Sequence, residues 1–311
     1  MTMVFPALSM LYAAITLVSL VARRRWPIEL LQHFRPHMIV AGIVGAVVCL
    51  WLEPAWGWAA IALGFALVNV AALPSPRFIK PDASLAGQPG LTIVWANVWT
   101  SEAPLKRTLD WAKAQGADVI LIGEYPREAS PDDALAGDYP YRIAGPPQPE
   151  GEICSTRVVA LSRVAIGDAV VHGGPGPHAR SFVTFSVAVG DAVLNVIAVH
   201  PVPPNTAALT GERDKQIAML AAHARGAFVI AGDFNATPWT PAFADIPGRR
   251  IGAYLFAPTW LSGLPLLGLP IDHVMASEGL RVSRYEVGPP ALGSDHRALL
   301  ARIHAPSQKQ A

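Results

Sequence analysis

The stretch Phe-Val-Ile-Ala-Gly-Asp-Phe-Asn, residues 228–235, is the most informative part of this 311-residue chain. Its apolar start predicts a buried β-strand. In an extended segment, the side chains of residues i and i+2 point to the same side, so Asp233 and Asn235 face together while Phe234 packs behind them. Gly232 permits close approach of a neighbouring backbone. The pattern predicts a strand that ends in a polar pair, and an Asx-type turn is the structural alternative.

Three other apolar runs also end in a polar residue. The runs are residues 91–96 before Asn97, 118–123 before Glu124 and 193–199 before His200. Strands that lie side by side bring such ends to one rim, where a rigid scaffold presents catalytic side chains. Two short motifs, Ile271-Asp272-His273 and Ser294-Asp295-His296, adjoin two further predicted strands. Each residue alone is compatible with a turn, but together they indicate a functional site.

The fold class follows from the alternation of short apolar runs with Gly- and Pro-rich turns after residue 90. Helical spacing of apolar residues predicts helices over residues 103–115 and 210–224. Many strands with few helices indicate two packed sheets with helices outside, which is an α/β or α+β fold. No Gly-x-Ser-x-Gly sequence occurs, and a contiguous Ser-Asp-His cannot form a nucleophile triad by itself, so serine hydrolysis is not expected.

The first 73 residues are apolar enough to lie in a bilayer. Three runs approach the ~20 residues that a bilayer core requires, at residues 4–22, 38–52 and 55–73. Between Met38 and Pro76 the one charged residue is Glu53, so the second and third runs are expected to form a hairpin that turns at Glu53-Pro54. A cleaved signal peptide is the alternative for the first run, although no positive side chain precedes it.

The basic residues near these runs predict an orientation. Lys and Arg mark the cytoplasmic side of short loops. With three spans, one side holds Arg23, Arg24, Arg25, Arg35, Arg77 and Lys80. This predicts a multi-pass protein of the inner cell membrane with a cytoplasmic globular part, and the side reverses if one run does not span. Residues 74–90 are then a linker, 91–304 the globular domain and 305–311 a tail.

Composition excludes several classes of protein. Hydrophobic residues make up 52% of the chain and charged residues only 15%, which is too apolar for disorder. Cys49 and Cys154 lie in different regions, so a disulfide is not expected. The globular part has a slight acidic excess and no visible Lys- or Arg-rich loop. Tight, sequence-independent binding of duplex nucleic acid is therefore not expected.

The polar residues, taken in order, resemble a known superfamily. The resemblance rests on Asn97, the Glu124 strand, His200-Pro201, residues 232–235, 271–273 and 294–296. In order and spacing they are similar to the endonuclease/exonuclease/phosphatase superfamily, which has the deoxyribonuclease fold, and most similar to its bacterial membrane-anchored members. The resemblance implies a four-layer α/β/β/α sandwich with the site between the loop ends of the sheets. Glu152 is a candidate for orienting the His200 ring.

The resemblance further implies a metal-dependent phosphoesterase that hydrolyses phosphodiester or phosphomonoester bonds with an activated water. Hard oxygen atoms hold Mg²⁺, with Mn²⁺ as an alternative, and the expected ligands are Asn97, Glu124 and Asp295. Asp233 is expected to accept a proton from the water or orient it, and Asn235 to donate to the developing oxyanion. His296, oriented by Asp272, is expected to contact phosphate or act as base. His200 is the expected general acid or phosphate ligand.

The substrate remains open between nucleic acid and a lipid or small phosphoester. The amino-terminal helices are expected to contact membrane lipid, and no protein partner is indicated. Residues 251–271 carry no charge and are rich in Leu, Gly and Pro, so they are expected either to pack on the core or to dip into the bilayer. A catalytically inactive domain with a binding or structural role at the membrane is the alternative to an enzyme.

Overall fold

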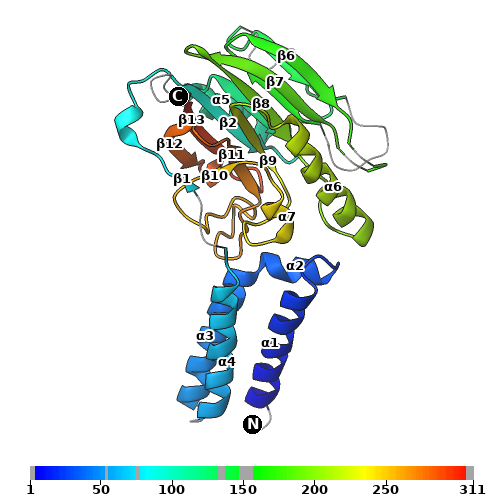
Figure 1. Ribbon diagram of the computed structural model, residues 1–311, viewed down its shortest axis with the longest axis vertical. Helices are drawn as coiled ribbons and strands as arrows, with labels where there is room; N and C mark the ends of the chain where they lie inside the picture. The colour runs from blue at the N-terminus through cyan, green and yellow to red at the C-terminus, as the bar shows by residue number, and fades with distance from the viewer. Residues whose placement is uncertain are drawn as a thin grey trace.

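The computed structural model describes residues 4–52, 55–74, 78–131, 137–146, 157–174, 176–178 and 180–305. The predicted turn at Glu53-Pro54, Glu152 and Cys154 lie outside these residues, as do residues 306–311 of the expected tail. The helices within residues 4–71 form a stalk, which carries a larger part that is built on β-sheets (Figure 1).

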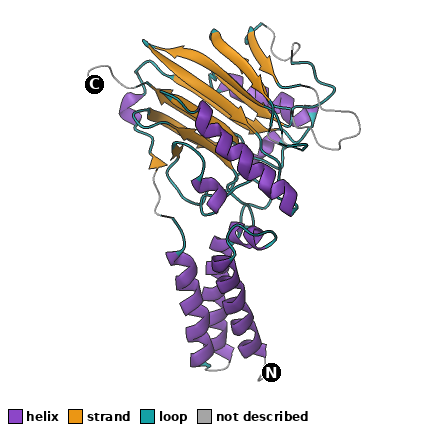
Figure 2. Cartoon of the chain, turned by 45° about the vertical axis from the view of Figure 1, so that its right-hand side comes forward, coloured by secondary structure: helices purple, strands orange, loops and turns teal. Residues whose placement is uncertain are grey.

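Two mixed β-sheets form the larger part (Figure 2). The first has the order β1-β10-β11-β9-β8-β7-β6. Its strands are β1 Phe78–Ile79, β6 Ile166–His172, β7 Phe182–Val189, β8 Ala192–Val199, β9 Phe228–Asp233, β10 Arg249–Ile251 and β11 Asp272–Ala276. The second has the order β12-β13-β2-β3-β5-β4. Its strands are β2 Leu91–Asn97, β3 Val119–Gly123, β4 Tyr141–Ala144, β5 Val159–Ser162, β12 Arg281–Val287 and β13 Leu299–His304.

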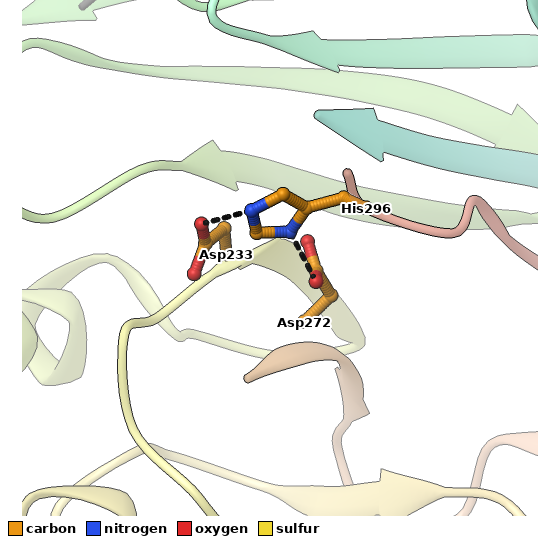
Figure 3. A group of neighbouring side chains, drawn as sticks. All are labelled: Asp233, Asp272 and His296. Atoms are coloured by element: carbon orange, nitrogen blue, oxygen red, sulfur yellow. Dashed lines mark hydrogen bonds and ion pairs between the residues drawn. The ribbon is translucent and has the colours of Figure 1, made fainter. Parts of the chain in front are cut away.

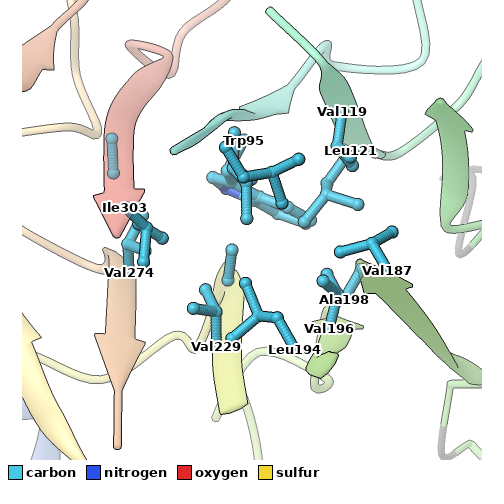
Figure 4. Packing of buried hydrophobic residues seen from close by; sticks show 14 of the residues in the cluster. Trp95, Val119, Leu121, Val187, Leu194, Val196, Ala198, Val229, Val274 and Ile303 are labelled. Carbon is cyan, nitrogen blue, oxygen red and sulfur yellow. The ribbon is translucent and has the colours of Figure 1, made fainter. Parts of the chain in front are cut away.

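The main core lies between the two sheets, and a helix covers each outer face. Trp95 and Leu121 of the second sheet meet Val196 and Val229 of the first in one buried cluster (Figure 4). Helix α5, Glu102–Ala114, packs on the outer face of the second sheet. Helix α6, Ala207–His223, and the short α7, Pro241–Ala244, pack on the outer face of the first. The layers are helix, sheet, sheet and helix, which is the sandwich that the resemblance implied.

Part of the expected linker belongs to this sandwich. Strand β1 pairs in parallel with β10, Phe78 opposite Arg250. A short 3₁₀ helix, Ala83–Leu85, follows it and buries Leu85. The sandwich therefore begins at Phe78 and not at residue 91. A two-residue strand is too short to produce an alternating pattern, so only its tertiary pairing reveals it.

In the amino-terminal region, residues 4–52 and 55–74 contain four helices, one more than the apolar runs predict. Three follow the predicted runs, α1 Val4–Val21, α3 Arg35–Leu52 and α4 Trp56–Ala71, and α2, Ile28–His33, lies across their end, next to the sandwich (Figure 1). Among the described residues, α1 is the one helix that is long and apolar enough to cross a membrane, and the apolar parts of α3 and α4 are shorter.

Polar and small side chains fill the interior of this helical stalk. Buried positions on α1 and α4 are small or polar residues, with Thr16 and Asn69 fully buried. Asn69 Nδ2 donates to Thr16 Oγ1 at 3.1 Å, and Arg35 Nη1 donates to Asn69 Oδ1 at 2.9 Å. Large apolar residues such as Val40 and Leu67 are instead exposed on the outside. This is the reverse of the pattern in a soluble helical bundle.

Candidate active site

Strand direction brings the predicted polar residues to one edge of the sandwich. Strands β2 and β3 are parallel, with Asn97 paired with Gly123 directly before Glu124. Strands β8 and β9 are also parallel, so His200, which follows β8, and Asp233, which ends β9, lie at neighbouring strand ends. Strand β11 runs antiparallel to β9 and pairs Asp272 with Asp233. The carboxyl ends of parallel strands meet at the same edge, which is the physical reason for this convergence.

Asp233 is the centre of the resulting cluster. His200 Nε2 lies 3.4 Å from Asp233 Oδ2 and 3.6 Å from Glu124 Oε1. Asn97 Nδ2 donates to Glu124 Oε1 at 3.2 Å and to Asp233 Oδ2 at 3.3 Å. Residues from both sheets are therefore joined through one carboxylate. A Cβ atom at Gly232 would collide with the Val199 carbonyl oxygen, so the close strand approach expected of this glycine is present.

A buried histidine–carboxylate pair faces Asp233 from the other side (Figure 3). His296 Nδ1 lies 2.8 Å from Asp272 Oδ2, and His296 Nε2 lies 3.7 Å from Asp233 Oδ2. The second oxygen of Asp272 accepts a hydrogen bond from Trp95 Nε1 at 2.8 Å. Trp95 is therefore a site residue that the sequence analysis missed, since it reads as an ordinary core residue of its strand.

The charges in this cluster stabilise one another. Burial opposes protonation of His296, but Asp272 and Asp233 outweigh it and raise the pKa of His296 to about 10. Burial likewise opposes ionisation of Asp233. The positive charge of His296 and the hydrogen bond from His200 outweigh that cost and hold the pKa of Asp233 well below its ordinary value. An imidazolium beside a carboxylate is thus the resting arrangement at neutral pH.

Asn235 and Glu124 are held by backbone conformations that few residues adopt. Their φ angles are 49° and 51°, in the left-handed region. The Asn235 amide N–H donates to Asp233 Oδ1 at 2.9 Å, and its side-chain Nδ2 donates to the Pro201 carbonyl at 3.0 Å. One further N–H of the Asn235 side chain is available to a ligand, because an amide carries two. Such strained positions cluster at functional sites.

These residues surround a cavity of about 400 Å³. Six of the eight predicted site residues line it, namely Glu124, His200, Asp233, Asn235, Asp295 and His296. Asn97 and Asp272 are buried behind the wall and hydrogen-bonded to residues that line it. All eight therefore belong to one constellation.

Other residues of the cavity wall were not predicted. Arg180 lines it and places Nη1 2.7 Å from His200 Nδ1. The sole sequence signal for Arg180 is its position two residues before the apolar run that begins at Phe182. Trp99 and Trp260 also line the cavity, and so do residues of helix α2. The contribution of α2 depends on how the stalk is seated on the sandwich, which no local sequence pattern contains.

Two sets of groups in the site are suited to a divalent cation. Asp233, Asp272 and His296 present ligand atoms within 4.8 Å of one another. In that set, however, Asp272 and His296 already bind each other. The second set is Glu124 and Asp295. Burial and the negative charge of Glu124 raise the pKa of Asp295, although the charge of His296 acts in the opposite direction. Carboxylates that repel each other in a partly buried cavity fit a bound cation, which would neutralise them.

A family model identifies the chain. Residues 94–296 match the model of the Endonuclease/Exonuclease/phosphatase family. The chain belongs to this family. Membership indicates a hydrolase of the phosphodiesterase or phosphatase type, and the matched residues extend from β2 to His296. No curated protein is similar to the chain in sequence at a significant level.

Solved structures share the fold of this family member. An endonuclease/exonuclease/phosphatase from Beutenbergia cavernae is 20% identical, with a TM-score of 0.55, and the match covers 71% of this chain and 72% of that one. A family protein from Leptotrichia buccalis is 16% identical, with a TM-score of 0.56 and coverage of 69% and 99%. The human Nocturnin catalytic domain with bound sulfate is 13% identical, with a TM-score of 0.54 and coverage of 70% and 93%. At these identities the likeness concerns the fold alone.

Proposed function

We propose that this protein is a membrane-tethered, divalent-metal-dependent phosphoesterase that hydrolyses phosphodiester or phosphomonoester bonds by attack of water. The observation that carries the proposal is the convergence of Glu124, His200, Asp233 and His296 in one cavity. A cluster that combines carboxylates, imidazoles and an amide can activate water and bind phosphoryl oxygens in the same place.

The chain's own residues have distinct roles in this proposal. Asp233, ionised between two imidazoles, orients the attacking water and accepts its proton. Protonated His296 cannot act as a base, so it contacts a phosphoryl oxygen and offsets its charge. Asn235 donates its remaining N–H to the same oxyanion. His200, beside Arg180, binds phosphate or protonates the leaving oxygen.

Glu124 and Asp295 would hold the metal, with Asn97 keeping Glu124 in place. We propose Mg²⁺ as the ion, with Mn²⁺ able to replace it, because the groups are hard oxygen donors. When bound, the ion supplies Lewis-acid stabilisation of the phosphoryl charge. The side-chain nitrogen of Asn97 faces Glu124. For Asn97 to bind the metal through its side-chain oxygen, as expected from the resemblance, the oxygen and nitrogen of its amide would have to exchange places.

The side chains of the stalk support the membrane tether. Large apolar side chains outside and small or polar ones inside is the arrangement of helices that pack within lipid. We propose that α1, α3 and α4 span the inner membrane as a multi-pass anchor that contacts membrane lipid. The basic residues Arg23–Arg25 lie between α1 and α2, and Arg35 begins α3. By the positive-inside rule they support a cytoplasmic catalytic part.

Hydrolysis of chromogenic phosphoesters by the full chain in detergent tests this function. With Mg²⁺, we expect release of p-nitrophenol from bis-p-nitrophenyl phosphate or from p-nitrophenyl phosphate, and loss of that activity in EDTA. Asp233→Ala should lower kcat by about 10²- to 10⁴-fold, the usual cost of removing a proton-transfer group. Asp191→Ala is the matched control, because Asp191 is exposed in a hairpin turn away from the site.

The alternative is a catalytically inactive domain of the same fold with a binding or structural role at the membrane. It predicts equal, background rates with Mg²⁺, with EDTA and in Asp233→Ala. That result would refute the proposed enzyme.

A further inference from the structure

The cavity of the proposed active site is closed on one side by the amino-terminal region. Leu30, His33 and Phe34, from helix α2 and the residue that follows it, line the same cavity as His200 and Asp233. Helix α2 lies at the end of the stalk that is next to the sandwich (Figure 1). The wall of the site that faces the proposed membrane is therefore made by the segment that joins two membrane helices.

Buried polar contacts hold α2 in this position. Glu29 Oε1 accepts a hydrogen bond from Arg213 Nη2 of helix α6 at 3.1 Å, with exposed side-chain fractions of 2% and 1%. Trp239 Nε1 donates to the His33 carbonyl at 3.2 Å. Burying an ion pair is costly unless its geometry is good. The Glu29–Arg213 pair therefore indicates a specific interface between α2 and α6.

An apolar loop, flanked by two residues of the cavity wall, also reaches the stalk. Residues 261–268 lie between Trp260 and Leu269, which pair with each other in an isolated bridge and both line the cavity. The carbonyl of Leu266 lies 3.0 Å from His37 Nε2, at the beginning of α3. The side chains of Leu264, Leu266 and Leu267 are exposed by 60%, 88% and 57%. This part of the uncharged 251–271 segment does not pack on the core, whereas Ile271 does.

The cavity itself has two chemically different parts. In one part, Arg180 contacts His200, and Asn235 contacts the carbonyl of the neighbouring Pro201; these three polar residues of the wall suit a phosphate. The walls toward α2 and the apolar loop are formed by Leu30, Phe34, Trp260 and Leu269. A wholly polar substrate would leave these walls uncovered, while a phosphate ester that carries hydrocarbon is complementary to both parts.

We propose that the substrate is a lipid phosphoester, which enters from the bilayer between α2 and the 261–268 loop. Its phosphate lies at the Arg180–His200 end, and its hydrocarbon chain lies along Phe34 and Trp260 and leaves toward the membrane. The exposed leucines of the loop sit in the lipid beside the beginning of α3. This inference rests on the proposed phosphoesterase function and names the substrate class of that same site.

Matched substrates that differ only in hydrocarbon test this inference. The full chain in dodecyl maltoside with Mg²⁺ is given p-nitrophenyl hexadecyl phosphate and p-nitrophenyl ethyl phosphate as diesters, and hexadecyl phosphate and ethyl phosphate as monoesters. We expect kcat/KM at least about 100-fold higher for the long-chain member of the pair that is hydrolysed. Phe34→Ala should reduce that ratio about tenfold. Val193→Ala, at an apolar, exposed position on β8 away from the cavity, should leave the ratio unchanged.

The outcomes separate the two levels of the proposal. Equal kcat/KM for long- and short-chain esters, or a ratio that Phe34→Ala does not change, would overturn the lipid inference and leave the phosphoesterase in place. Preference for a single-stranded oligodeoxynucleotide over the hexadecyl esters would do the same. Absence of hydrolysis with every ester and the oligonucleotide would remove the proposed function, and the inference with it.

Discussion

The Asp272–His296 pair depends on a residue of the opposite sheet. Both oxygens of Asp272 are engaged, one by His296 Nδ1 and the other by Trp95 Nε1, each at 2.8 Å. Trp95 belongs to β2 and Asp272 to β11, so the indole joins the two sheets directly behind the site. The carboxylate therefore has one orientation, and it transmits that orientation to the imidazole that faces Asp233.

Asp272→Asn tests this positioning role. The variant keeps an acceptor for Trp95 but loses the charge that holds His296, so we expect kcat to fall by about 10²- to 10⁴-fold with a much smaller change in KM. Steady-state kinetics on the chromogenic ester measure both constants. The control is Asp191→Asn, which should match the unmodified protein. An unchanged kcat in Asp272→Asn, or a change in KM alone, would show that the pair does not position a reacting group.

Helices α2 and α6 together connect the stalk with the active site. Arg213 of α6 donates through Nη2 to Glu29 of α2 and through Nη1 to the Asn235 carbonyl, both at 3.1 Å. One guanidinium therefore links helix α2 with Asn235, the strained residue of the cavity wall. Arg24 makes a second link between the two regions through Asp245, but its side chain is 53% exposed and that of Asp245 41%. The two links differ in burial while joining the same two regions.

Glu29→Gln and Asp245→Asn compare these links. Removing one partner of a buried ion pair costs about 3–5 kcal/mol, and Asp214, 2.8 Å from Arg213, should reduce that cost. We expect Glu29→Gln to lower the thermal midpoint in detergent by several degrees and kcat by about tenfold, because Asn235 loses its fixed support. Asp245→Asn should change stability by less than about 1 kcal/mol, as exposed pairs do. Equal effects of the two variants would contradict the proposed connection.

The whole molecule is a catalytic sandwich seated on a helical stalk. The carboxyl end of α1, all of α2, the beginning of α3 and the end of α4 lie at the end of the stalk next to the sandwich (Figure 1). Three spanning helices would then put the amino terminus on the membrane side opposite the sandwich. On the side of the stalk, α2 forms part of the wall of the site.

Protease accessibility tests this arrangement. In bacterial cells that express the full chain, an epitope at the carboxyl terminus should be digested in inverted inner-membrane vesicles and protected in spheroplasts, because the positive-inside rule, applied to Arg23–Arg25 and Arg35, predicts that this side is cytoplasmic. An epitope at the amino terminus should show the opposite pattern, and the chain should stay in the membrane after carbonate extraction. Both epitopes on one side would require an even number of spans.

Local pattern accounts for much of the site and for the class of fold. Apolar runs that end in Asn97, Glu124, His200 and Asp233 predicted strands with polar ends, and all four lie together at one edge of the sandwich. The three long helices of the stalk were also predicted, because long apolar runs indicate helices without any tertiary information. Helix α2 was not predicted, because its six residues are too few to show the helical spacing of apolar residues.

Apolar period and strand-end chemistry, which are local properties, determined two packed sheets with polar strand ends at one edge, and the order of those polar residues carried the family resemblance. Which distant groups complete that site depended on tertiary packing. Trp95 reaches Asp272 across the core, Arg180 meets His200, and the wall formed by Leu30 and Phe34 comes from the stalk. The reason is physical: hydrogen bonds and apolar contacts act over a few ångströms in space regardless of sequence separation, so only the folded arrangement of the layers can bring these groups together.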